Sequence, residues 1–133
     1  MQNIKVVQTS ARPVQELFDV LSDHIKLKDV FGIPVSRIRD GDKELNGVGS
    51  VRRLGLIGVE ETVTAMERNR SIEYKISRGG YPVRNHSGRI DFSSDGKGSQ
   101  VTWTIRFDGP PVIGSIVASL LNTAVTRGLR RIA

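Results

Sequence analysis

The sequence predicts an α+β domain in which a curved antiparallel β-sheet of about six to seven strands wraps around a long C-terminal α-helix. Between Val35 and Gly109, short β-rich segments alternate with turn residues at hairpin spacing. After Gly109 the apolar residues change to a helical period that continues to the end of the sequence. At 133 residues, the chain is long enough to bury one core without disulfides, so we expect a single domain over residues 1–133.

The first strand is expected over Asn3 to Thr9, which is β-rich and partly alternating. A short amphipathic helix then follows Pro13 and runs to about His24, because apolar residues recur on one helical face at Val14, Leu17, Phe18 and Leu21. The next segment, up to Pro34, loses this period, which indicates a connection with room for a second short helix. His24 is expected at a solvated helix end.

The central strands are separated by four pairs of turn residues: Asp40-Gly41, Asn46-Gly47, Gly79-Gly80 and Asp95-Gly96. This spacing predicts five or six consecutive antiparallel strands. The clearest is the last, in which Val101, Trp103, Ile105 and Phe107 alternate with polar residues. One face of the sheet is therefore expected to be buried and the other to face water.

The final helix has a broad apolar stripe formed by Ile113, Val117, Leu120, Leu121, Ala124 and Leu129. The basic residues Arg127, Arg130 and Arg131 suit the negative pole of its dipole. Its first half is nearly uncharged, which leaves a membrane-anchored alternative. A helix that covers a sheet needs such an apolar face in any case, and the run is expected to be too short to span a bilayer.

Composition excludes several classes of site and partner. The sequence has no cysteine, and its two histidines, His24 and His86, lie far apart, so we expect no metal site and no cofactor. The net charge of +6 invites nucleic-acid binding, but most arginines are scattered and aromatic residues are 5% of the chain, so this partner is disfavoured. The N-terminus lacks the basic and apolar segments of a secretory signal, which favours a cytoplasmic protein. The sequence leaves the oligomeric state open between monomer and homodimer.

Four segments carry a resemblance to a known family: GVGSVRRLGL from Gly47, VEETVTAMERNRSIEYKI from Val59, GGYPVRNHSGRIDF from Gly79 and QVTWTIRFDGPP from Gln100. They resemble the polyketide cyclase/dehydrase and lipid-transport family of the START and Bet v 1-like (SRPBCC) superfamily. The resemblance covers essentially the whole chain and implies the helix-grip fold with an internal cavity. Many members have an aromatic residue, often in a Trp-His-Pro run, where this chain has LKDVFGIP, and here Phe31 is the one aromatic residue that takes that place.

The same segments resemble plant abscisic-acid receptors in outline. The resemblance implies two loops that act as lids at the mouth of the cavity, although the lid motifs of the receptors are not reproduced residue for residue. By position the lid loops are Leu54, Gly55, Leu56, Ile57 and Gly58, and Gly79, Gly80, Tyr81 and Pro82.

Two residues carry candidate acid–base chemistry. Glu61 has the same strand parity as Val59 and Val63, so its carboxylate would lie on an apolar face and need a partner such as Arg52, Arg78 or Arg84. It also falls where the receptor-like relatives contact their ligand. His86 has the inward parity of Ile90, which places it either in the cavity or at its rim in water.

The residues expected to contact a ligand share inward parity on the strands or the inner face of the last helix. They are Glu61, Val63, Tyr74, Ile76, Arg78, His86, Gly88, Ile90, Trp103, Ile105, Val117 and Leu121.

Two functions from different classes fit this pattern, and a third stays open. The favoured one is binding of a small hydrophobic metabolite, such as a lipid, polyketide or isoprenoid, for transport, storage or sensing. The alternative is a polyketide aromatase/cyclase or dehydratase in which Glu61 or His86 moves protons and Arg78 or Arg84 stabilises an enolate. The third is a protein or RNA interaction module that uses the basic surface.

Overall fold

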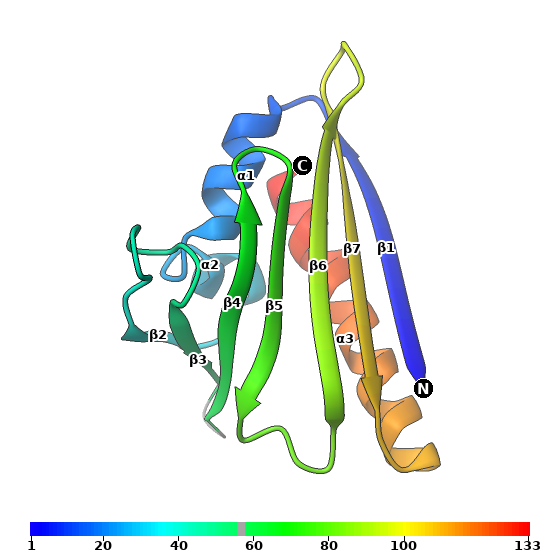
Figure 1. Ribbon diagram of the computed structural model, residues 1–133. Coiled ribbons are helices and arrows are strands. Elements are labelled where there is room, and N and C mark those ends of the chain that lie inside the picture. The colour runs from blue at the N-terminus through cyan, green and yellow to red at the C-terminus, as the bar shows by residue number, and fades with distance from the viewer. Residues whose placement is uncertain (56–57) are drawn as a thin grey trace.

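The computed structural model describes residues 1–55 and 58–133 of the chain. These residues form a seven-stranded antiparallel sheet, three helices and the connections between them (Figure 1). The strands are β1 (Gln2–Ser10), β2 (Val35–Arg39), β3 (Val51–Leu54), β4 (Val59–Glu67), β5 (Ser71–Arg78), β6 (Arg84–Ser94) and β7 (Ser99–Asp108). The helices are α1 (Val14–Ser22), α2 (Leu27–Phe31) and α3 (Pro111–Ile132). The expected helix-grip architecture is confirmed.

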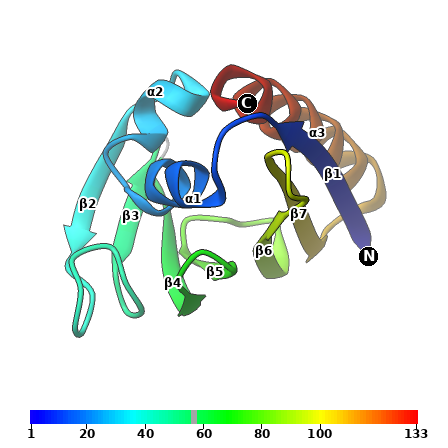
Figure 2. The same ribbon diagram turned by 90° about the horizontal axis from the view of Figure 1, so that it is seen from above.

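The sheet has the strand order β1-β7-β6-β5-β4-β3-β2, so the first strand of the chain pairs with the last. From β2 onward each strand pairs with the next along the chain, as the hairpin spacing predicts. Seen from above, the sheet is an arc with the three helices on its concave side (Figure 2).

The core lies between the concave face and the helices. On β7, Val101, Trp103, Ile105 and Phe107 are all buried, as the alternation predicts. Helix α1 packs Phe18 edge-to-face against Phe92 of β6, with ring centroids 5.3 Å apart. These contacts fill the space between α1 and the concave face of the sheet.

Helix α3 is buried unevenly along its length. Val125, Leu129 and Ile132 in its second half belong to the core, whereas several apolar side chains in its first half are exposed. It is 22 residues long, close to the run of about twenty that the helical period predicts. By length and composition alone it is the one helix among residues 1–55 and 58–133 that could cross a membrane. Of the residues in its most apolar 18-residue segment, 22% are buried. Its position against β1 and α2 is also that of a helix gripped by a sheet.

Candidate functional site

Two adjoining cavities lie between the concave face of the sheet and the middle of α3, residues 117–125. Their volumes are about 440 Å³ and 150 Å³, and both are lined mostly by apolar side chains. We call the two together the inner cavity. The residues that line both parts are Ile33, Leu54, Glu61, Tyr74, Ile105 and Leu121. A largely apolar space of this size with a few polar groups is typical of a small-molecule site.

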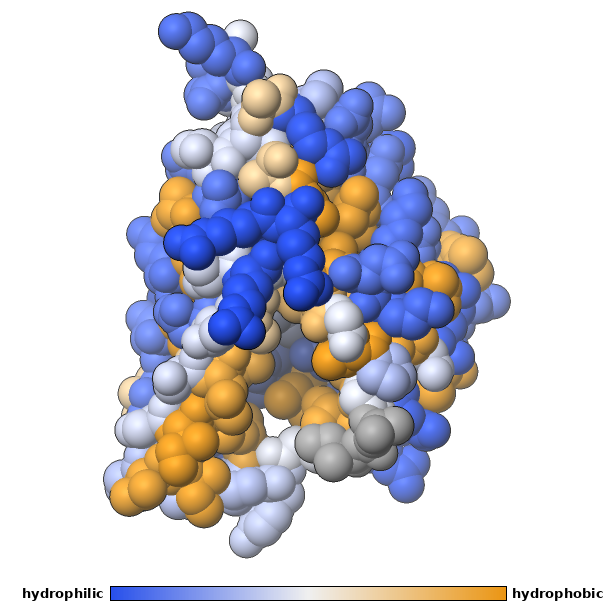
Figure 3. All heavy atoms as spheres, turned by 180° about the vertical axis from the view of Figure 1, so that it is seen from behind, coloured by the Kyte–Doolittle hydropathy of each residue, from blue (hydrophilic) through white to orange (hydrophobic). Residues whose placement is uncertain are grey.

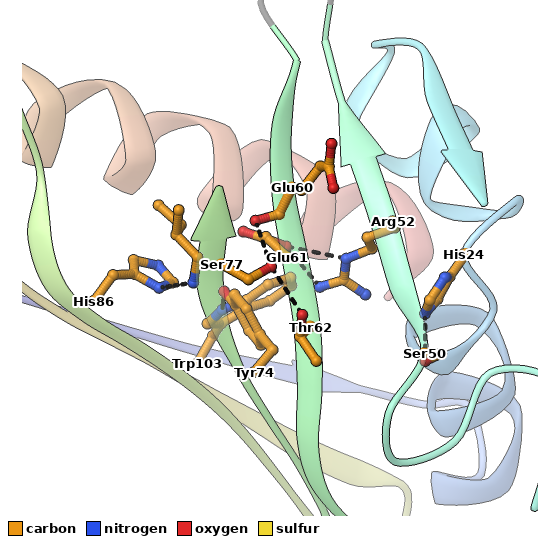
Figure 4. Close-up of polar contacts among 11 residues, drawn as sticks. His24, Ser50, Arg52, Glu60, Glu61, Thr62, Tyr74, Ser77, His86 and Trp103 are labelled. Carbon is orange, nitrogen blue, oxygen red and sulfur yellow. Dashed lines mark hydrogen bonds and ion pairs between the residues drawn. The ribbon is translucent and has the colours of Figure 1, made fainter. Parts of the chain in front are cut away.

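A buried ion pair forms the polar centre of this cavity. Arg52 on β3 and Glu61 on β4 are register partners, so their side chains leave the sheet together. Arg52 donates from Nε to Oε1 of Glu61 at 3.0 Å, its Nη2 lies 2.9 Å from the same oxygen, and the two side chains are 4% and 12% exposed (Figure 4). Arg78 and Arg84, the other partners considered, are exposed. Register therefore selects Arg52 as the partner of Glu61.

Tyr74 lies beside this ion pair and is held on three sides. The Arg52 guanidinium lies over its ring, 5.1 Å from the centroid, and Trp103 Nε1 donates to its hydroxyl at 2.8 Å. On the third side a Cβ at Gly88 would lie 2.1 Å from the ring, so only glycine permits this approach. Burial, and then the charge of Glu61, raise the pKa of Tyr74 well above its usual value, so the hydroxyl stays neutral.

His86 lies on β6 at the edge of the same cavity. Its Nδ1 accepts a hydrogen bond of 3.0 Å from the backbone N–H of Ile76 on β5 (Figure 4). The register between β6 and β7 shifts between Arg84 and Ser87, the interval that contains His86 and also Asn85, whose φ is 53°. Burial lowers the pKa of His86, so the ring is neutral at pH 7, and the bond to Nδ1 leaves the proton on Nε2. The ring therefore offers one N–H donor.

The remaining residues expected at the site fall into three groups. Ile76 and Val117 line the larger part of the cavity, with Ile105 and Leu121, and Trp103 lines the smaller part. Val63 and Ile90 are buried in the core and line neither part, and Gly88 lies behind the ring of Tyr74. Arg78 is exposed and lines neither part.

The two expected lid segments meet at the larger part of the cavity. Leu54 and Gly55 line it from one side, and Gly79, Gly80, Tyr81 and Pro82 line it from the other. A Cβ at Gly79 would lie 2.7 Å from the backbone oxygen of Gly58, so the two loops approach each other closely there. Leu56 and Ile57 lie outside the described residues.

Three features of the site lie outside the set of residues predicted to contact a ligand. Arg52 was considered only as a partner for Glu61, yet it also lines the smaller part of the cavity. Phe31 packs edge-to-face on Trp103, with centroids 5.6 Å apart, so α2 closes that end with an aromatic side chain. Glu60, next to Glu61, is also largely buried and pairs with Arg53 at 3.0 Å. The adjacent arginines of β3 and the adjacent glutamates of β4 were the available signal for both ion pairs.

The expectation for His24 is wrong. Its side chain is fully buried, with Nε2 3.2 Å from the hydroxyl of Ser50, because the β2–β3 connection folds over the end of α1. In that connection Asn46 accepts from the backbone N–H of His24 and from Arg37. Burial, and then the charges of Arg52 and Arg37, lower the pKa of His24 to about 4. These contacts hold the loop against α1, away from the inner cavity.

A third hollow of about 450 Å³ lies over the β2–β3 connection and has a different character. Its lining includes the charged residues Asp42, Lys43, Glu44 and Arg68. It therefore suits a small apolar molecule less well than the inner cavity. Among residues 1–55 and 58–133, no group of three or more His, Cys, Asp or Glu side chains is arranged to hold a metal ion.

Comparison with known proteins gives a family and a fold. A family model described as polyketide cyclase/dehydrase and lipid transport matches residues 1–133. No curated protein matches the chain. Many solved structures do, all those named here at less than 25% identity, so the likeness shows the fold alone.

Three solved structures illustrate the match. A protein of Nitrosospira multiformis has 12% identity and a TM-score of 0.79, with 99% of this chain and 97% of that chain covered. Ara h 8.0201, a Bet v 1-like protein, has 15% identity and a TM-score of 0.74, with 98% and 97% covered. CalU16 from Micromonospora echinospora has 15% identity and a TM-score of 0.71, with 98% and 73% covered.

Proposed function

The chain belongs to the polyketide cyclase/dehydrase and lipid transport family, and from this premise we propose that it binds a small, mostly apolar molecule in the inner cavity. The observation that carries the proposal is a space of about 440 Å³, next to a smaller one with which it shares lining residues, whose apolar lining surrounds a single buried ion pair among the described residues. Both the family and the Bet v 1-like fold support a hydrophobic ligand. Such a site is suited to transport, storage or sensing of the bound molecule.

The polar groups of the cavity favour a ligand with one polar end. The hydrogen bond from Arg52 Nε and the close ion-pair contact from Nη2 both end on Oε1 of Glu61, so Oε2 is the oxygen left to accept from a ligand hydroxyl. His86 supplies an N–H donor, which suits a ligand oxygen. Because Arg52 is already neutralised by Glu61, a neutral polar end is favoured over a carboxylate.

Native mass spectrometry on protein purified gently from its own cells tests this proposal. A reproducible added mass of a small molecule is expected. Val117→Phe places a large side chain in the larger part of the cavity and should abolish the added mass. Ser119→Phe introduces the same residue at an exposed position on the same helix and should retain it. Added mass that survives Val117→Phe would place the molecule elsewhere and refute the proposal.

The aromatase/cyclase or dehydratase alternative has one observation in its favour. Glu61 and the neutral His86 line the same part of the cavity, where a proton acceptor and a proton donor would face one substrate. Both groups are held by other contacts, to Arg52 and to the backbone of Ile76, which favours binding over turnover. If the chain is an enzyme, His86→Gln should lose turnover of a poly-β-ketone thioester and still bind it.

A further inference from the structure

The outward face of α3 is divided along its length into an apolar half and a basic half. In the first half, Val112, Ile113, Ile116 and Leu120 are 73%, 45%, 55% and 66% exposed. We call these four residues the apolar patch. They follow one another at helical spacing, so they form one continuous surface and not scattered exposures. In Figure 3 this surface is the orange area over the first half of the helix.

The basic half continues the same face of the helix. Steps of three, four and seven residues lead from Ile113 to Ile116, Leu120 and then Arg127, and such steps keep one side of a helix. Arg127, Arg130 and Arg131 are all exposed, and Figure 3 shows blue surface above the orange area. No Asp or Glu occurs from residue 109 to residue 133. The face therefore combines apolar surface with positive charge that no acidic residue of α3 itself compensates.

The apolar patch is also continuous with the rim of the inner cavity. Leu120 belongs to the patch and lines the larger part of the cavity, next to Val117 and Leu121. Tyr81, at the opposite rim, is 92% exposed. In Figure 3 a hollow opens directly beside the orange area. A surface that receives the apolar patch would therefore also face the opening of the cavity.

We propose that this face docks reversibly on an anionic lipid bilayer. The apolar patch enters the boundary between headgroups and acyl chains, and the arginines of the second half contact anionic headgroups. The positive charge of the second half favours a bilayer over a second copy of the chain. Pairing with a second copy through the apolar patch would cover the apolar side chains but would leave both sets of arginines without counter-charges. A bilayer with anionic lipid satisfies both halves. Docking in this way extends the proposed function, because the cavity would open toward a store of apolar molecules.

Vesicle flotation with the purified full chain tests the docking. The probes are vesicles of phosphatidylcholine alone and of an equal mixture of phosphatidylcholine and phosphatidylglycerol. Binding is expected to the mixed vesicles, weaker by an order of magnitude or more for phosphatidylcholine alone, and reduced by added salt. Equal binding to both vesicle types, or to neither, would overturn the proposal.

Variants separate the two halves of the face. Ile116→Ser with Leu120→Ser should lower partitioning by roughly tenfold per side chain. Arg127→Gln with Arg130→Gln should lower it by about fivefold per arginine, for the mixed vesicles only. All four residues are exposed, so the variants should keep the thermal midpoint of the parent.

Matched controls change the same residue types elsewhere on the surface. Ile38→Ser with Leu45→Ser removes exposed apolar side chains of β2 and its following loop, and Arg84→Gln with Arg106→Gln removes exposed arginines. Both control variants should bind vesicles as the parent does. A loss of vesicle binding in these controls as large as in the α3 variants would refute docking through this face of α3.

Light scattering after gel filtration measures the oligomeric state and tests the competing explanation, that a second copy of the chain covers the apolar patch. A dimer of the parent chain that Ile116→Ser with Leu120→Ser converts to a monomer would show that a second copy occupies the face, which overturns the proposal. Vesicle binding does not require a filled cavity, and Val117→Phe should retain it. Failure of docking and failure of ligand binding are therefore distinguishable.

Discussion

The indole N–H of Trp103 donates to the hydroxyl of Tyr74 at 2.8 Å, and both side chains are buried in the wall of the inner cavity. The bond joins β7 to β5 across the intervening strand β6. It fixes the phenol ring against the backbone of β6 and next to the Arg52–Glu61 ion pair. The polar centre of the cavity is thereby tied to the middle of the sheet.

The coupling between these two residues is measurable. Trp103→Phe removes the donor and some apolar contact, and should lower the free energy of unfolding by about 2 kcal/mol. Tyr74→Phe should cost about 1 kcal/mol. In a double-mutant cycle from urea unfolding, an interaction energy of about 1 kcal/mol is expected. Strict additivity of the two changes would show that the hydrogen bond contributes nothing to stability.

Gly88→Ala should disturb the site through Tyr74. The added Cβ would lie 2.1 Å from the tyrosine ring, so the ring must move and the bond to Trp103 must lengthen or break. We expect a loss of at least about 2 kcal/mol in unfolding free energy, together with a changed emission spectrum of Trp103, the single tryptophan of the chain. Gly109→Ala is the control, because its Cβ would come no closer than 3.7 Å to another atom. An unchanged spectrum in Gly88→Ala would contradict this account.

Breaking the buried ion pair should cost more than breaking its neighbour. Arg52→Met leaves the carboxylate of Glu61 without its cation in a largely buried site, and should lower the unfolding free energy by about 3 kcal/mol. Arg53→Met removes the half-exposed partner of Glu60 on the same strand, and should cost about 1 kcal/mol or less. Urea unfolding of both variants at pH 7 checks the difference. Equal costs would mean that burial does not govern the Arg52–Glu61 pair.

Replacing both members of the pair separates stability from binding. Arg52→Met with Glu61→Leu removes both charges together, so most of the stability lost in the single variant should return. The ligand detected by native mass spectrometry should still be lost or bind more weakly, since Glu61 is its proposed acceptor. Undiminished binding in this double variant would exclude Glu61 as a ligand contact.

His24 should make the protein less stable in mild acid. Its pKa is about 4 in the folded chain against about 6.5 when unfolded, so the unfolded chain binds the proton more readily between these values. Stability is therefore complete above pH 6.5 and is lost as the pH falls toward 4, by about 3 kcal/mol in total. Unfolding free energies measured from pH 7 to 4.5 should show this slope, and His24→Gln should flatten it. The pKa of His86 is also lowered, so His86→Gln is the control for its share.

The fold was predictable because the hydrophobic periods of its strands and helices can be recognised within short, continuous segments of the sequence. The alternation that ends at Phe107 and the helical run that follows Pro111 are local patterns, and the structure confirms both. The ion pair was predictable only as a choice among arginines, because strand register decides which one faces Glu61. The burial of His24 was not predictable, since it depends on a loop that returns from residues 40–50. Contacts between distant segments leave no periodic trace in a sequence.

The pairing of β1 with β7 sets the order in which the sheet can be completed during synthesis. Gln2 is the register partner of Phe107, so the ribosome synthesises β1 about a hundred residues before the β7 residues that pair with it. Until then the apolar side chains of β1 have no strand to pair with, while the β2–β6 hairpins can already form. In the nascent chain β1 therefore stays unpaired until β7 has been made, and the pairing of β1 with β7 is the step that completes the sheet.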